Sequence, residues 1–177
     1  LSCKNYYGVG NVIKNNSFYG AALSCDTALV YDSKILENRA ESMGHNDFIN
    51  SRYASLKRDT IENNKLGTLM ADCNYGFVVD SSYISSNSCQ LCYVNELKDN
   101  GDSASYCVLN SQVINNVTTF VGGKDSSFVY VNANGPTDMF VFHRTMFSGN
   151  NCNLGVFDLT SMNVLISQSL IKDNISN

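Results

Sequence analysis

A nine-residue pattern recurs seven times along this 177-residue sequence and restricts the chain to a repetitive architecture. Each copy has the form apolar-x-x-small-x-apolar-x-x-Asn, and successive copies begin 23 to 34 residues apart. The copies occupy residues 7–15, 30–38, 56–64, 79–87, 108–116, 142–150 and 166–174. A unit of this length cannot bury its own apolar side chains, so adjacent units must stack on one another. The pattern therefore predicts a solenoid.

Each copy also predicts two short strands separated by a corner. Apolar residues alternate before the corner, as at Phe140 and Phe142, which is typical of a strand with one buried face. We therefore expect an all-β fold in which about seven coils form a single domain over residues 1–177. We also expect this domain to be a segment of a longer solenoid or a stacking subunit, because no capping helix follows the last copy.

The last position of every copy is Asn, which predicts a hydrogen-bonded ladder along the solenoid. Asn tolerates the backbone of a tight corner, and its amide can bond to the amide of the next coil. The predicted ladder consists of Asn15, Asn38, Asn64, Asn87, Asn116, Asn150 and Asn174. Asn15, Asn116 and Asn174 also begin Asn-x-Ser/Thr motifs for N-glycosylation. We expect all three to be unmodified, because an inward Asn cannot carry a glycan without breaking the ladder.

The repeats resemble the right-handed parallel β-helix, or pectin-lyase-like, superfamily over residues 5–177. Within that superfamily they are most similar to Asn-rich surface repeat proteins of the polymorphic outer-membrane-protein type. The resemblance implies right-handed coils and a non-enzymatic structural or adhesive role in an extracellular or cell-surface assembly. Two alternatives stay open: a polysaccharide lyase or hydrolase of the same fold, and a scaffold subunit of a filament or particle.

Composition narrows the range of partners. The net charge is −4 without a basic cluster, which argues against nucleic-acid binding. The sequence has no apolar run of about 18 residues, so we expect no membrane-spanning helix. Charged residues make up only 16% of the chain, and Asn and Ser contribute 24 and 22 residues, a composition that argues against a helical bundle.

The sequence offers no convergent catalytic set, so we predict no catalytic residue and leave open whether the chain is an enzyme. Asp32 and Asp80 should lie two coils apart with Lys57 and Arg58 between them, which favours a solvated charge ladder. Asp59 occupies the small column, where we expect it to bond to serine hydroxyls or turn amides; the alternative is an acid with a perturbed pKa. The two histidines, His45 and His143, fall on different coils and are interpreted as surface or packing residues.

The seven cysteines do not define a disulfide framework. Cys25 with Cys73, and Cys89 with Cys152, should be two coils or about 9.6 Å apart, which is too far for a disulfide. Cys89 and Cys92 form a single CxxC, for which we expect free thiols, with a local disulfide as the alternative. A zinc site would need two further ligands, so we predict neither a metal site nor a cofactor.

A stripe of apolar residues should face outward. The residues immediately before the first apolar column are Tyr6, Leu29, Ser55, Val78, Cys107, Val141 and Leu165. An apolar stripe of this length predicts a covered surface, either beneath one of the chain's own loops or against another subunit. Among these residues, Leu29, Val78, Val141 and Leu165 are the candidate assembly stripe, and the expected partner is a second copy or a longer parent solenoid. A carbohydrate or a surface protein is the alternative partner.

Overall fold

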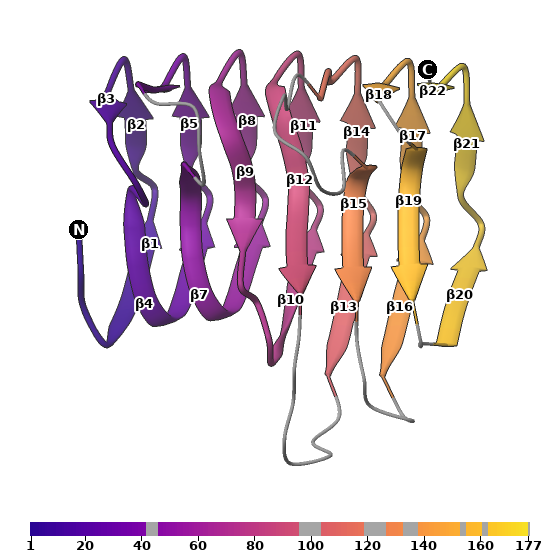
Figure 1. The fold of residues 1–177 in the computed structure, drawn as a ribbon, viewed down its shortest axis with the longest axis horizontal. Helices are drawn as coiled ribbons and strands as arrows, with labels where there is room; N and C mark the ends of the chain where they lie inside the picture. Colours follow the sequence, from indigo (N-terminus) through magenta and orange to yellow (C-terminus); the bar gives the residue numbers. More distant parts are fainter. Residues whose placement is uncertain are drawn as a thin grey trace.

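The computed structural model describes residues 1–41, 46–95, 104–118, 127–132, 138–152, 155–160 and 163–176. Within these residues the chain contains strands and no helix, and its parallel sheets stack as a β-solenoid (Figure 1). The coils follow one another along the long axis in sequence order, so each coil contacts chiefly the preceding and the following one. The all-β solenoid predicted from the repeat is therefore present.

The first sheet is built from the second strand of each repeat. It contains seven parallel strands among the described residues, in sequence order. Its strands are β2 (Val12–Lys14), β5 (Lys34–Leu36), β8 (Thr60–Glu62), β11 (Tyr83–Ser85), β14 (Gln112–Ile114), β17 (Met146–Ser148) and β21 (Leu170–Lys172). The central residue of each strand points inward, and Ile35, Ile61 and Ile84 are completely or almost completely buried.

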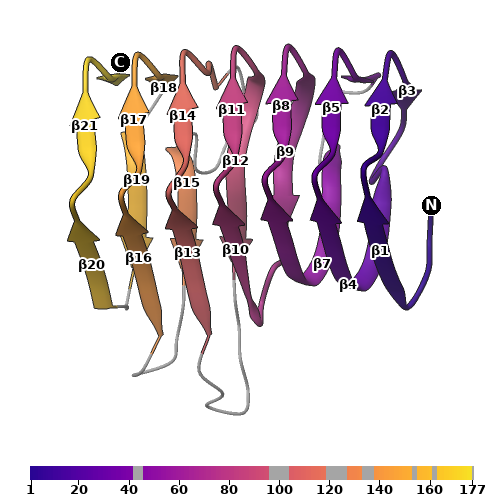
Figure 2. The ribbon, with the colours of Figure 1, turned by 180° about the vertical axis from the view of Figure 1, so that it is seen from behind.

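The second sheet folds around the other side of the solenoid, because β4 (Leu23–Tyr31) and β7 (Asp47–Lys57) each run through both of its halves. One half, seen in front in Figure 2, is completed by β1 (Asn5–Val9), β10 (Gly76–Asp80), β13 (Ser105–Leu109), β16 (Met139–His143) and β20 (Asn163–Ser167). The other half contains β9 (Lys65–Ala71), β12 (Ser88–Asn95), β15 (Ser127–Asn132) and β19 (Gly155–Thr160). The two-residue strands are β3 (Ser17–Phe18), β6 (Arg39–Ala40), β18 (Asn151–Cys152) and β22 (Ile175–Ser176).

The core is one continuous apolar column that runs through the coils. Parallel pairing in register places equivalent residues above one another, so Phe77, Tyr106 and Phe140 are consecutive members of one inward column. The rings of Phe77 and Tyr106 lie 5.5 Å apart, and those of Phe142 and Phe147 lie 5.0 Å apart across the interior. Such edge-to-face contacts add to the stabilisation from burial of the rings.

Each repeat turns two corners through a residue in the left-handed backbone region. The first corner is formed by Gly10, Asp32, Arg58, Ser81, Asn110, Arg144 and Gln168. The second corner is formed by Asn15, Glu37, Asn63, Ser86, Asn115, Gly149 and Asp173. A positive φ in a residue other than Gly is uncommon and costs roughly 1–2 kcal/mol, so each corner needs stabilising contacts from its surroundings.

The register shows that the predicted first copy of the repeat is displaced by one residue. Ile13, not Val12, pairs with Ile35, and Gly8, not Tyr7, pairs with Val30. The first copy is therefore 8–16. The sequence pattern missed it because Gly8 stands where the other coils carry an apolar residue. A Cβ at Gly8 would lie only 2.6 Å from the hydroxyl of Tyr6, so the Tyr6 ring occupies the space of the missing side chain.

Candidate functional site

The asparagine ladder connects the second corners of the coils. The backbone N–H and Nδ2 of Asn38 both donate to Oδ1 of Asn64, at 2.9 and 3.0 Å, and Asn64 donates in the same way to Asn87 at 2.9 Å. The same pair of bonds joins Asn87 to Asn116, Asn116 to Asn150 and Asn150 to Asn174.

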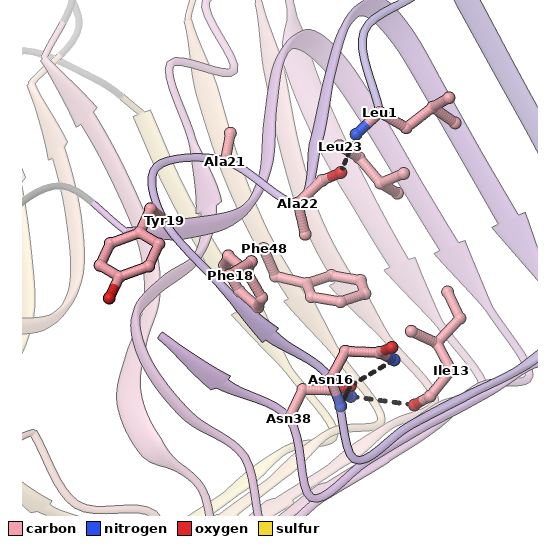
Figure 3. Close-up of a pocket in the computed structure, with 10 residues that line it drawn as sticks. All are labelled: Leu1, Ile13, Asn16, Phe18, Tyr19, Ala21, Ala22, Leu23, Asn38 and Phe48. Atoms are coloured by element: carbon pink, nitrogen blue, oxygen red, sulfur yellow. Dashed lines mark hydrogen bonds between the residues drawn. The ribbon is translucent and has the colours of Figure 1, made fainter. Parts of the chain in front are cut away.

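The prediction that Asn15 begins this ladder is wrong. Asn16 occupies the first rung, and its N–H and Nδ2 donate to Oδ1 of Asn38 at 3.1 and 3.0 Å (Figure 3). Asn15 instead forms the left-handed corner immediately before it, with φ of 57°, and its side chain is exposed. Two adjacent Asn residues fit the pattern equally well, and only the pairing of β2 with β5 decides between them.

A second ladder follows the first corners and contains Asp59. The N–H of Ser33 donates to Oδ1 of Asp59 at 2.7 Å, and the N–H of Asp59 donates to Oγ of Ser82 at 3.1 Å. The Asp59 carboxylate thus accepts from a turn amide, as expected for a corner acid, and its backbone N–H donates to a serine hydroxyl. Its Oδ2 is buried without a hydrogen-bond partner among the described residues. Burial, opposed by backbone N–H groups, raises the pKa of Asp59 from 3.8 to about 7.

Charged side chains alternate along the outside of the same corner. Both Nε and Nη2 of Arg58 donate to the Asp32 carboxylate at 2.6 Å, and this hydrogen bonding lowers the pKa of Asp32. Nζ of Lys57 lies 3.8 Å from the Asp80 carboxylate on the next coil. Each carboxylate thus pairs with a cation of an adjacent coil, which agrees with the predicted charge ladder.

The outward column of the front half of the second sheet carries the predicted apolar stripe. Strand pairing defines the column as Tyr7, Leu29, Ser55, Val78, Cys107, Val141 and Leu165. Tyr7 replaces the predicted Tyr6, which packs against the core. Leu29, Val78 and Val141 are half-buried between their neighbours, Tyr7 is 66% exposed and Leu165 is 51% exposed. We call this column the outer-face stripe.

Aromatic and apolar side chains of the flanking columns widen this stripe. Tyr31 and Leu109 belong to the column two residues further along each strand, and the rings of Tyr7 and Tyr31 meet edge to face at 5.7 Å. Tyr53 belongs to the column two residues before the stripe. Its pKa is raised by burial and by the nearby Tyr31. No described segment of the chain crosses this half of the sheet (Figure 2). The described part of this face therefore presents an apolar central column between columns that mix apolar, polar and charged side chains.

The solenoid interior is accessible in a cavity of about 430 Å³ at the first coils (Figure 3). Its walls include Ile13, Leu23, Phe18 and Phe48, and the last two rings lie 6.4 Å apart. The asparagines at the cavity, Asn16 and Asn38, are members of the ladder. The cavity is thus a continuation of the core with the ladder along one edge.

All seven cysteines are free thiols, including Cys89 and Cys92, so the alternative of a local disulfide is wrong in this structure. Burial raises the pKa of Cys73 and of Cys89 to about 12, which keeps both as uncharged packing groups at ordinary pH.

Some of the predicted features lie outside the described residues. They include His45. Within the described ranges no group of three His, Cys, Asp or Glu side chains is arranged to hold a metal ion. The described part of the chain also contains no helix of the length and apolar character needed to span a membrane. The described histidine, His143, has Nδ1 2.8 Å from Oγ of Ser167 on the next coil.

Sequence reasoning missed two members of these sites, Asn16 and Tyr7, for the same reason. The signal that would have found them was present: in every copy except the first, an apolar residue stands two positions before the first apolar column. If the first copy begins one residue later, Tyr6 becomes the apolar residue two positions before the first column. The first copy then agrees with the other six.

Comparisons of the chain with protein-family models, with curated proteins and with solved structures found no match.

Proposed function

We propose that this chain is a structural or adhesive β-solenoid of an extracellular or cell-surface assembly, and that it associates with a second copy through the outer-face stripe. We further propose that its coils are right-handed and of the pectin-lyase-like type, as the repeat pattern suggests. The observation that carries the association is the apolar outward column on a sheet half that no described segment covers.

The chemistry of the stripe supports a protein partner. Six of its seven members are apolar, counting Tyr7 and Cys107, whereas isolated surface hydrophobes need no partner. The charged residues beside it, Lys57 and Asp80, already lie 3.8 Å from each other. An apolar surface that docks here therefore does not leave either charge without its counterion.

The order of side chains along the stripe favours a second copy. About Val78 the column is nearly symmetric in size: Tyr7 corresponds to Leu165, Leu29 to Val141, and Ser55 to Cys107. A two-fold axis at Val78 would therefore bring Tyr7 against Leu165 and Leu29 against Val141 in both halves of the interface, the reciprocal contacts of an isologous dimer.

The area of the face that carries the stripe determines how strongly two copies are expected to associate. Strands about 4.8 Å apart and three outward columns about 6.6 Å apart give a face of roughly 30 by 15 Å. Two such faces would bury about 900 Å² in total, which corresponds to a weak and reversible dimer. The proposed association should therefore depend on concentration.

Sedimentation of the chain over a range of concentrations tests the proposal. We expect a monomer–dimer equilibrium whose dissociation constant rises at least about tenfold when Leu29→Lys and Val141→Lys are combined, because each change buries a charge in the interface. Gln112→Lys, on the exposed surface of β14, is a control that adds a positive charge away from the stripe and should leave the equilibrium unchanged. A wild-type chain that stays monomeric at about 1 mM, or a double variant that dimerises normally, would contradict the proposal.

A further inference from the structure

The three Asn-x-Ser/Thr motifs of the sequence have different structural settings, although all three were expected to lie in the ladder. The difference matters because an N-glycan is attached to the side-chain nitrogen, which must be accessible and must have room for a sugar. The hydrogen bonds and burial of Asn116, Asn174 and Asn15 therefore show which of the three side chains can accept a glycan.

Asn116 has no room for a modification. It is completely buried, and its Nδ2 donates to the carbonyl oxygens of Ile84 and Ile114, each at 3.1 Å, and to Oδ1 of Asn150 at 3.0 Å. A sugar on this nitrogen would replace one of its two hydrogens and would lie within the interior of the solenoid. A glycan at Asn116 is therefore incompatible with the fold.

Asn174 is also held by the ladder. Its Oδ1 accepts from the N–H and Nδ2 of Asn150, at 3.0 and 2.8 Å, and its Nδ2 donates to the carbonyl oxygen of Phe147 at 3.1 Å. These three bonds orient the amide along the solenoid and direct Nδ2 toward the preceding coil.

Asn15 differs on each of these points. It lies on the outer corner between β2 and β3, its side chain is exposed, and its amide makes no hydrogen bond among the described residues. Its backbone is held by the bond from its N–H to the carbonyl oxygen of Leu36. Ser17, the hydroxyl residue of the motif, is exposed as well.

We propose that Asn15 is an N-glycan acceptor site, and that neither Asn116 nor Asn174 is modified in the folded chain. The inference rests on the proposed extracellular or cell-surface location, because N-glycan transfer requires entry into a secretory compartment. A glycan at the corner after β2 projects from the edge that lies at the top of Figure 2, whereas the outer-face stripe follows β1 and its partners in the lower half. The glycan therefore leaves the proposed dimer face free.

Expression in insect or yeast cells behind a cleavable signal peptide tests the site directly, since it imposes the compartment. The folded chain is purified from the medium and the lumenal fraction and treated with a peptide-N-glycosidase, which leaves Asp at every modified position. Peptide mapping should then show occupancy at Asn15 at least about fivefold above that at Asn116 or Asn174. Asn15→Gly, which suits the left-handed corner, and Ser17→Ala should each reduce the intact mass to that of the unmodified chain.

Two results would overturn the inference: an unmodified Asn15 in the folded, lumenal chain, or occupancy of Asn116 or Asn174 equal to that of Asn15. Because the signal peptide directs the chain into the lumen in every case, either failure concerns the site and not the proposed location. The dimer equilibrium of the glycosylated chain and of the Asn15→Gly variant provides a separate readout. Equal dissociation constants are expected if the glycan lies away from the stripe, and a loss of dimer only in the glycosylated chain would contradict its placement.

Discussion

Each interior ladder asparagine joins three successive coils through one side chain. Asn64 shows the arrangement: its Nδ2 donates to the carbonyl oxygen of Ile35 in the preceding coil, to that of Glu62 in its own coil and to Oδ1 of Asn87 in the next, at 2.9–3.0 Å. Its oxygen accepts the two bonds from Asn38. The amide thereby satisfies buried backbone groups beside a left-handed corner, where the sheet cannot do so.

Asn116→Ala should therefore destabilise the fold by about 1–3 kcal/mol or more. The change removes the acceptor of the Asn87 N–H and a donor to Ile84 and Ile114, and buried polar groups left without partners carry this cost. Urea denaturation followed by circular dichroism measures the effect. Asn15→Gly is the matched control, with an expected change within about 0.5 kcal/mol because the corner residue is exposed. Equal losses in the two variants would contradict the assignment of Asn16 to the ladder.

Asp59 should make stability depend on pH in the opposite sense to a carboxylate whose pKa is lowered on folding, such as Asp32. Its pKa is raised by burial to about 7 in the folded chain and has its ordinary value of 3.8 in the unfolded chain, so the folded state retains a proton that the unfolded state releases. Its contribution to stability is complete below pH 3.8, falls as pH rises from 3.8 to 7, and is lost above that range. Between pH 5 and 7 the loss should be roughly 2–3 kcal/mol, at about 1.4 kcal/mol per pH unit.

The measurement is the urea midpoint of the wild type relative to Asp59→Asn at pH 5, 6, 7 and 8. Asn retains an acceptor for the Ser33 N–H but does not ionise. The stability of the variant relative to the wild type should therefore increase as pH rises. Asp26→Asn, at an exposed position, controls for the change in net charge. A constant difference between wild type and Asp59→Asn across this range would show that Asp59 does not titrate between these pH values.

At the scale of strands, the sequence pattern located the second strand of each repeat from the second copy onward. Those strands follow the first corner and place one apolar residue inward, a local pattern that sterics and burial define together. The pattern misplaced the first coil because Gly8 has no side chain at an inward position. The large ring of Tyr6, at the preceding inward position, fills that space instead. Such compensation is visible only in three dimensions.

The strands of the other half of the second sheet contain irregularities that the sequence pattern does not show. The register between β9 and β12 shifts between Ser88 and Gln90, and β12 pairs with β15 only from Cys92 onward. Because a strand alternates its faces with a period of two, one irregular residue is enough to change which side chains point inward. The outer-face stripe, in contrast, follows strands that pair without a shift, which explains why six of its seven members could be predicted from the sequence.

At the scale of the whole molecule, the solenoid has no single centre. Its apolar core is a column in which each coil covers the next, so the stability at any point depends on two neighbours and not on the chain as a whole. The inward position of the first sheet shows the result: Ile84 on β11 is 1% exposed, whereas Ile171, in the same column on β21, is 41% exposed. An isoleucine in this column therefore contributes more to stability in the middle of the solenoid than in the last coil.

Truncation of these two residues measures that gradient. Ile84→Ala should destabilise the isolated 177-residue chain by about 2–5 kcal/mol, because it removes buried methyl groups and leaves a cavity between coils that cannot close. Ile171→Ala removes the same atoms from a half-exposed site and should cost roughly 1 kcal/mol. Hydrogen exchange should show the corresponding order, with β11 amides protected longer than those of β21. The comparison requires dilute, monomeric protein, and sedimentation of each sample is the control. Equal losses in the two variants would mean that Ile171 is covered in solution, which the exposed last coil described here does not allow.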